Sequence, residues 1–172
     1  MSEAIRQLEP RHLWGRFADL NAIPRASGKE AAVCAWITGL AQDAGLEVES
    51  DPVGNVLVRK PATPGMEGRK TVILQSHVDM VHQKNNDTAF DFNTEGIRMF
   101  VEGDWVKAEG TTLGADNGLG VATMLAVMES TDLPHPPHGG PDPPDRPTDT
   151  TRPTYRPTDT TDTTDRPFSL YR

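Results

Sequence analysis

The chain has 172 residues, of which 35% are hydrophobic, and its 17 Lys and Arg residues against 25 Asp and Glu give a formal net charge of −8. This acidity argues against nucleic acid or an anionic membrane as the main partner, because both attract basic surfaces. No apolar run approaches the roughly 18 residues that cross a bilayer, and the first residues lack the apolar core of a signal peptide. Cys34 is the single cysteine, so no intrachain disulfide can form, and a cytoplasmic location is expected.

The composition changes abruptly after Pro137. Residues 1–137 have the composition of one globular domain, whereas residues 138–172 contain nine Thr, seven Pro, six Asp and five Arg. Such a segment cannot bury enough apolar surface to offset an ordering entropy of about 1–2 kcal/mol per residue. We therefore expect residues 138–172 to be a disordered tail, either foreign to the globular part or produced by a frameshift.

Two helices are expected at the start of the globular part. Residues 10–23 carry large apolar side chains at helical spacing, and residues 27–45 form a second apolar segment of helical length. Ser27 with Glu30 three positions later matches a capping box, and Gly45 stands where a glycine ends many helices. These signals predict a second helix that begins just after Ser27 and ends just before Gly45.

The following residues predict five strands and a last helix. A strand, a turn and a second strand are expected over 46–61, and an apolar strand in the centre of the sheet over 70–81. A polar loop over 85–93 precedes a hairpin over 97–110, and a glycine-rich loop opens a helix over 111–130. This order of elements favours a mixed α/β domain.

Polar residues follow the central strand. His77 and Asp79 are two positions apart, so on a strand their side chains project to the same face, and Ser76 projects to the other. A neutral imidazole is a common zinc ligand, and a neighbouring carboxylate can orient it. For this pair taken alone, a simple hydrogen bond at a strand end is the favoured interpretation. A Ser76–His77–Asp79 triad is excluded, because nucleophile and base would point to opposite faces.

The glycine-rich stretch GTTLGADNGLGVA, residues 110–122, contains Asp116 next to Asn117. It lacks the G-x-G-x-x-G pattern of dinucleotide-binding loops and the G-K-[ST] of phosphate-binding loops. A flexible turn in which Asp116 caps the next helix is the simplest interpretation of this stretch alone.

Taken together, HVDMV and GTTLGADNGLGVA resemble the M20 family of metallopeptidases, and in particular its aminoacyl-histidine dipeptidase branch. NAIPRASGKE and DPVGNVLVRKPATPG are also similar to that branch, and the resemblance covers residues 1–137. It implies that this part of the chain is the N-terminal portion of a zinc-peptidase-like α/β catalytic domain. It also implies metal-dependent hydrolysis of dipeptides, Xaa-His dipeptides among them.

The resemblance also implies roles for individual residues. The family binds two metal ions, usually zinc, with manganese or cobalt as alternatives, and a metal-activated water attacks the peptide carbonyl. His77 would be a ligand of one ion, Asp79 the active-site aspartate that holds His77, and Asp116 the carboxylate that bridges both ions. The family often has a cis peptide after the bridging aspartate, and the loop glycines would relieve crowding around it.

Other parts of that machinery have no counterpart in this sequence. The family's general base lies in a Glu-Glu pair on a later strand, but Glu129 is the only glutamate after Asp116. We therefore expect a truncated and inactive enzyme that binds metal weakly, whose homodimer would require the missing region. The alternatives are a metal-free interaction module that presents its tail to partners, and a non-functional fragment. The remaining histidines and the cysteine are expected to be surface or structural residues: His12, Cys34, His82, His135 and His138.

Overall fold

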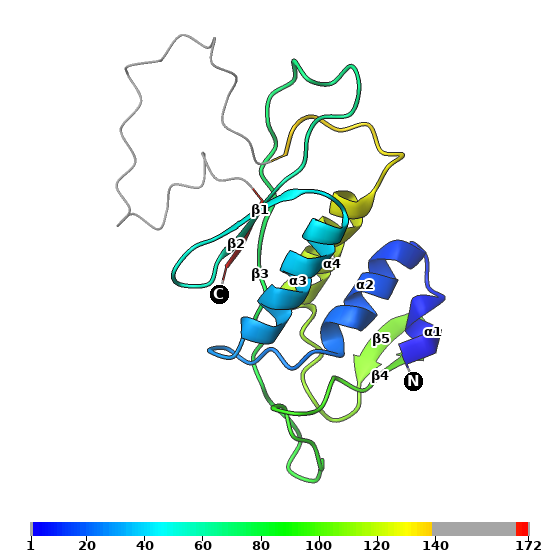
Figure 1. The fold of residues 1–172 in the computed structure, drawn as a ribbon. Helices are drawn as coiled ribbons and strands as arrows, with labels where there is room; N and C mark the ends of the chain where they lie inside the picture. Colours follow the sequence, from blue (N-terminus) through cyan, green and yellow to red (C-terminus); the bar gives the residue numbers. More distant parts are fainter. Residues whose placement is uncertain (1, 139–167, 172) are drawn as a thin grey trace, which may run out of the picture.

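The computed structural model describes residues 2–138 and 168–171 (Figure 1). Its helices are α1 Ser2–Arg6, α2 Arg11–Asn21, α3 Ala31–Asp43 and α4 Ala115–Glu129. Its strands are β1 Glu47–Ser50, β2 Val56–Arg59, β3 Gln75–His77, β4 Met99–Glu102, β5 Trp105–Ala108 and β6 Phe168–Tyr171. Among the described residues, no helix is both long and apolar enough to cross a membrane.

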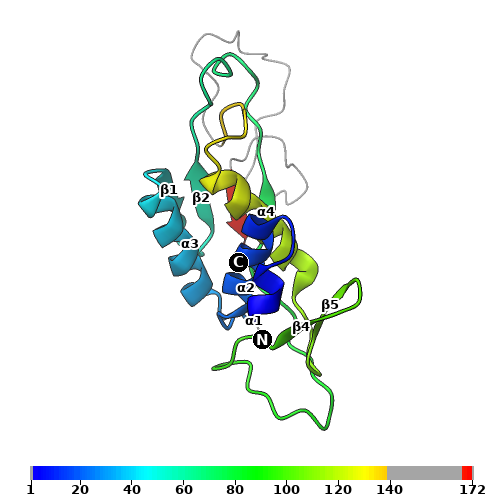
Figure 2. The ribbon, with the colours of Figure 1, turned by 90° about the vertical axis from the view of Figure 1, so that its right-hand side faces the viewer.

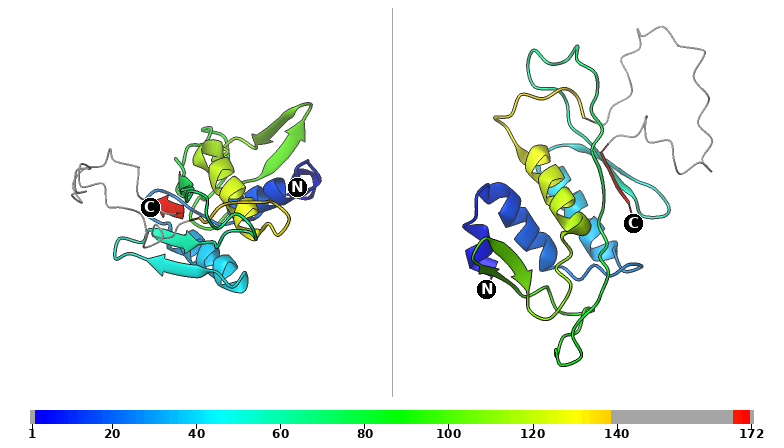
Figure 3. Two further views of the ribbon diagram at one scale, coloured as in Figure 1. Left: turned by 90° about the horizontal axis from the view of Figure 1, so that it is seen from above. Right: turned by 180° about the vertical axis from the view of Figure 1, so that it is seen from behind.

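The helices pack together beside a four-stranded sheet. Helix α3 contacts β1 and β2, helix α4 contacts β3, and α2 lies along α4 (Figures 1 and 3). Helix α1 and the hairpin β4–β5 lie side by side on the right of Figure 1, the side that faces the viewer in Figure 2. The predicted mixed α/β architecture is therefore confirmed. Helix α1, which the sequence pattern did not indicate, contacts α2 and β4.

Two apolar clusters form the core. The larger cluster joins α3, the β1–β2 hairpin and α4 around Ile37, Val58 and Leu125, each no more than 2% exposed. The smaller cluster joins α1, α2 and β4 around Ile5, Phe17 and Met99. Helix α4 contributes to both clusters and is apolar on more than one side. Val121, Met124, Leu125 and Met128 of this helix are buried.

The sheet departs from the prediction at its third strand. The apolar segment 70–81 yields only the three residues of β3, and Val72 is 39% exposed. The strand order is β1-β2-β6-β3, so β3 lies at one end of the four strands and not at the centre. The physical reason is that β2 and β3 do not pair with each other, and β6 lies between them.

Both predicted hairpins are confirmed. Strands β1 and β2 pair antiparallel, with Glu47 opposite Arg59. The turn between them is closed by Asp51, whose side chain accepts hydrogen bonds from the backbone N–H groups of Val53 and Asn55. Strands β4 and β5 pair antiparallel across Gly103 and Asp104 and form a separate two-stranded sheet.

The sequence predicted the C-terminal end of helix α3 correctly but not its N-terminal end. The helix ends as expected, with Gly45 at a φ of 71° and the N–H of Leu46 bonded to the carbonyl of Ala41, the pairing of a Schellman motif. The start is wrong. The helix begins at Ala31, and no side chain caps it. The residues before Ala31 form a separate turn, in which the N–H of Lys29 bonds the carbonyl of Ala26, and the Ser27 side chain faces Asp79, to which its hydroxyl donates.

The tail expected to be disordered over 138–172 lies mostly outside the described residues. At its two described places the backbone is instead paired. His138 exchanges two backbone hydrogen bonds with Lys60, and Phe168–Tyr171 forms β6 between β2 and β3. The globular part therefore extends past the composition change at Pro137, because the backbone of residues 137–138 pairs with the segments beside β2 and β3.

Candidate metal centre

His77 is the last residue of β3, and Asp79 follows it just beyond the strand. The two side chains project together, as the strand spacing predicted, and His77 Nδ1 lies 2.9 Å from Asp79 Oδ1. Ser76 points away into the fold, where it is 4% exposed and its hydroxyl donates to the carbonyl of Asn117. The contact between His77 and Asp79 orients the imidazole, because a carboxylate that accepts the proton of Nδ1 leaves the lone pair of Nε2 available.

Asp79 is itself held from a second direction by Ser27. The Ser27 hydroxyl donates to Asp79 Oδ2, while Oδ1 faces the imidazole. Burial raises the pKa of Asp79, but the hydrogen bonds from Ser27 and His77 outweigh it, and the pKa lies below its usual value. Among the described residues no hydrogen bond joins Ser27 to the imidazole, since each of the two bonds its own oxygen of Asp79. A serine nucleophile activated by His77 is therefore not what the site provides.

Asp116 approaches His77 from the other side. Its Oδ1 lies 3.1 Å from His77 Nε2, and its side chain is 95% exposed. The peptide bond Asp116–Asn117 is cis, as the family resemblance implied. Both residues have non-helical backbone angles at the start of α4, and no side chain caps this helix. The alternative of Asp116 as a helix cap therefore finds no support in the geometry.

Arg25, a residue that no sequence motif singled out for this role, connects the two loops that carry these residues. It is fully buried. Its Nη1 donates to the carbonyl oxygens of Val78 at 2.9 Å and Asp79 at 3.3 Å. Its Nη2 donates to the carbonyl of Gly114 at 2.8 Å and to Asn21 Oδ1 at 2.8 Å. One guanidinium thus binds the backbone beside Asp79 to the backbone two residues before Asp116.

The loop glycines make room for this connection. A Cβ at Gly114 would lie 2.5 Å from Arg25 Nη2, and one at Gly118 would lie 2.8 Å from the same atom. Gly114 also has a φ of 71°, which side chains rarely adopt. The resemblance predicted that the glycines relieve crowding around the Asp116–Asn117 peptide. This holds for Gly120, where a Cβ would meet Asn117 Oδ1, whereas at Gly114 and Gly118 a Cβ would meet Arg25.

The chemistry of this side-chain set fits one part of a metal site. An oriented imidazole and an exposed carboxylate oxygen, with His77 Nε2 and Asp116 Oδ1 on the same side, could share a divalent cation. A zinc site in an enzyme has three protein ligands, and no group of three His, Cys, Asp or Glu side chains suited to a metal occurs in residues 2–138 and 168–171.

The remaining histidines and the cysteine have structural surroundings. His12 bonds Glu129 at the surface, and His82 stacks on Phe92. His135 and His138 are buried against each other, away from the candidate ligands in sequence and in pairing. Cys34 packs against the larger core cluster. Each of these residues agrees with its expected surface or structural role.

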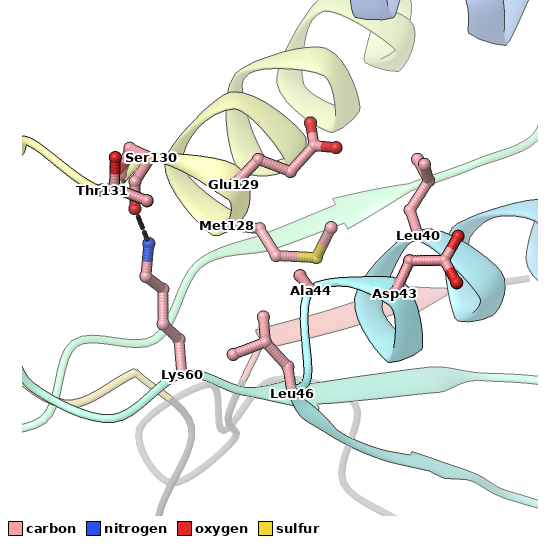
Figure 4. Close-up of a pocket in the computed structure, with 9 residues that line it drawn as sticks. All are labelled: Leu40, Asp43, Ala44, Leu46, Lys60, Met128, Glu129, Ser130 and Thr131. Atoms are coloured by element: carbon pink, nitrogen blue, oxygen red, sulfur yellow. Dashed lines mark hydrogen bonds between the residues drawn. The ribbon is translucent and has the colours of Figure 1, made fainter.

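Two cavities lie outside the candidate metal centre. One of about 450 Å³ is lined by Pro24, Lys29 and Phe92 among others. The other, of about 420 Å³, lies between the C-terminal ends of α3 and α4, where Lys60 reaches Ser130 (Figure 4). Neither of these two cavities is lined by His77, Asp79 or Asp116.

The known proteins that are similar to this chain are named as peptidases. No family model matches the chain. Over 137 residues it is 53% identical to a protein of Escherichia coli named cytosol non-specific dipeptidase. The matched residues make up 80% of this chain and 28% of that protein. The chain thus spans little more than a quarter of the length of this curated relative.

Solved structures agree with this relationship. The crystal structure of an aminoacylhistidine dipeptidase from Vibrio alginolyticus superimposes with a TM-score of 0.76 and 48% identity, over 80% of this chain and 29% of that one. A tripeptidase from Staphylococcus aureus, at 22% identity and a TM-score of 0.59, shares the fold over 76% of this chain and 35% of its own. The resemblance to the aminoacyl-histidine dipeptidases that the sequence motifs indicated is confirmed.

Proposed function

We propose that this member of the dipeptidase group carries part of an M20-type metallopeptidase active site, in which His77 and Asp116 are metal ligands and Asp79 positions His77. The observation that supports this most directly is the continuous contact from Asp79 Oδ1 through the His77 ring to Asp116 Oδ1. The names of the relatives support small peptides, dipeptides above all, as substrates of the whole protein, and the cytoplasm as its location.

The proposed metal is zinc, with manganese or cobalt as alternatives, and the whole enzyme would hold two ions. When bound, such an ion lowers the pKa of a water and polarises the peptide carbonyl. The residues of this chain contribute orientation. Asp79 keeps a proton on His77 Nδ1 and leaves Nε2 to face Asp116. Ser27 occupies the second oxygen of Asp79, which prevents that carboxylate from rotating away.

We further propose that these 172 residues alone do not hydrolyse dipeptides. General base catalysis is worth about 100- to 10,000-fold, and Glu129, the only glutamate after Asp116, is bound by Arg16 at the far end of α4. A homodimer is proposed only for a chain with further residues. The interaction-module hypothesis is not favoured by any contact in the part of the chain that the structure describes.

Metal titration with a matched control tests the proposal. Zinc or cobalt affinity is measured by calorimetry on the intact chain and on His77→Ala, Asp116→Asn and Asp79→Asn. Weak binding is expected, lost in the first two variants and reduced about 10- to 100-fold in the third, because the partner that orients a ligand typically has this effect. His12→Gln, whose ring is exposed and bound to Glu129, serves as the control and should leave affinity unchanged.

The activity half of the test uses β-Ala-His and other Xaa-His dipeptides with zinc, manganese or cobalt. No turnover above buffer is expected. Metal-dependent turnover that disappears in Asp116→Asn would show that the general base is present in the chain after all. Metal affinity that is the same in the wild type, His77→Ala and Asp116→Asn would refute the ligand assignment.

A further inference from the structure

The turn between α2 and α3 carries a buried charged residue on each side of an exposed stretch. Residues 27–29 are exposed, whereas Arg25 before them is fully buried and Glu30 after them is 2% exposed. Arg25 binds the two loops of the candidate metal centre. A buried carboxylate is costly unless its oxygens accept hydrogen bonds, so the position of Glu30 needs a physical reason of its own.

The carboxylate of Glu30 bonds the backbone of the turn. Its Oε1 accepts a hydrogen bond from the N–H of Gly28 at 2.5 Å. Gly28 has a φ of 86°, in the left-handed region that favours glycine, and the N–H of Lys29 bonds the carbonyl of Ala26. The turn is therefore fixed by its own backbone conformation at Gly28 and, from inside the fold, by a buried acceptor.

The residue next to Gly28 contacts the candidate metal centre. The hydroxyl of Ser27 donates to Asp79 Oδ2, and Asp79 Oδ1 lies 2.9 Å from His77 Nδ1. Because the serine side chain is short, the direction of its hydroxyl follows the backbone of the turn. The conformation at Gly28 therefore decides whether Asp79 is held at its second oxygen.

We propose that Glu30 is a positioning residue for the metal centre, which acts through the turn and Asp79 on the imidazole of His77. The inference rests on the proposed function, in which His77 is a metal ligand and Asp79 keeps a proton on its Nδ1. Glu30 contributes a hydrogen-bond acceptor in this role, so an uncharged acceptor of the same shape should replace it. A carboxylate that only supports the start of α3 would affect stability and not the imidazole.

Four variants separate these roles. Glu30→Met keeps a side chain of similar length but removes both oxygens, whereas Glu30→Gln keeps one acceptor oxygen for the N–H of Gly28. Ser27→Ala removes the hydroxyl at Asp79 and shows the full effect of losing this contact. Val33→Ala is the stability control, because Val33 is fully buried in the first turn of α3 and its truncation leaves a cavity in the core.

The measurement is solvent exchange of the His77 Nδ1 proton, followed by NMR on the isotope-labelled intact chain without metal. Glu30→Met and Ser27→Ala should speed this exchange by about 10-fold, the size expected for the loss of one hydrogen bond. Glu30→Gln should exchange at the wild-type rate. Val33→Ala should unfold at lower urea concentration and also keep the wild-type exchange rate.

Three results would overturn the proposal. The first is an exchange rate in Glu30→Met equal to that of the wild type. The second is a Glu30→Gln variant that exchanges as fast as Glu30→Met, because the acceptor would then not be what matters. The third is equally fast exchange in Val33→Ala, which would assign the effect of Glu30 to stability alone.

Zinc calorimetry on the same variants distinguishes this inference from the proposed function. Zinc affinity should fall by about 10-fold in Glu30→Met, the low end of the effect of groups that orient a ligand, and stay at the wild-type value in Glu30→Gln. Equal zinc affinity in the wild type and Glu30→Met would count against the positioning role. A wild-type chain that binds no zinc but shows the expected exchange rates would contradict the metal assignment and support the role of Glu30.

Discussion

Replacing Arg25 should destabilise the fold more than any other single change at the site. Arg25 is fully buried and donates hydrogen bonds to three carbonyl oxygens and to Asn21 Oδ1. Burial lowers the pKa of Arg25 to about 10, although the negative charge of Asp79 raises it in part. This lowering of the pKa corresponds to a cost of about 3 kcal/mol for keeping the guanidinium charge buried. The charged donor returns about 1.5–3 kcal/mol for each well-formed bond, so the balance favours the buried guanidinium.

Arg25→Ala removes this donor and leaves its four acceptor oxygens without it. Leaving a buried acceptor without its donor costs about 1–3 kcal/mol, so losing several at once is a large part of the 5–15 kcal/mol that stabilises a typical domain. Arg25→Lys should lose less, because an ammonium keeps the charge but cannot span the carbonyls of Val78 and Gly114 together. The order of stability is therefore wild type, then Lys, then Ala.

Urea unfolding, followed by tryptophan fluorescence and circular dichroism, measures these differences. The matched control is Arg11→Ala, whose side chain is 67% exposed and pairs with Glu9, which is 75% exposed, so its loss should stay below about 0.5 kcal/mol. A loss below about 1 kcal/mol in Arg25→Ala would refute the reasoning, as would an Arg25→Lys variant as stable as the wild type.

Two further predictions concern the β2 end of the fold. Lys60→Met should lower the free energy of unfolding in urea by about 1–3 kcal/mol, because the buried Lys60 ammonium donates to the carbonyls of Val127 and Ser130 at the C-terminal end of α4. The control is Lys70→Met, at an exposed position. Equal losses in the two variants would contradict this role of Lys60. Burial lowers the pKa of His138, helped by the charges of His135 and Lys60 and opposed by a hydrogen bond to Val72. The folded state therefore prefers the neutral ring, and stability should fall as pH drops from about 6.5 toward the lower folded pKa. This decrease should shrink in His138→Gln, and identical pH profiles would show that His138 does not contribute.

The sequence could predict the parts of the fold that depend on neighbouring residues. Helical spacing identified α2 and α3, and turn residues identified both hairpins. The projection of His77 with Asp79 follows from strand geometry alone, because the two residues are only two positions apart. The contact with Asp116 across 39 residues came from the family resemblance and not from spacing.

The parts that depend on distant residues could not be predicted in this way. Ser27 has a local pattern that favours a helix cap, but it caps no helix, and its hydroxyl donates to Asp79, 52 residues away. Arg25 has no local pattern at all, since its partners at Val78 and Gly114 lie 53 and 89 residues further along the chain. The short β3 reflects its pairing with β6, a partner in the segment whose composition predicted disorder.

The position of Arg25 in the chain sets an order of events during synthesis. A ribosome adds about 5–20 residues per second, so the 89 residues between Arg25 and Gly114 take on the order of ten seconds to make. Throughout that interval the guanidinium has only part of its set of acceptors, and a charge without its partners is stable only in water. The neighbourhood of α2 must therefore stay hydrated until the start of α4 emerges, and the His77 loop and the Asp116 loop become fixed in the same step.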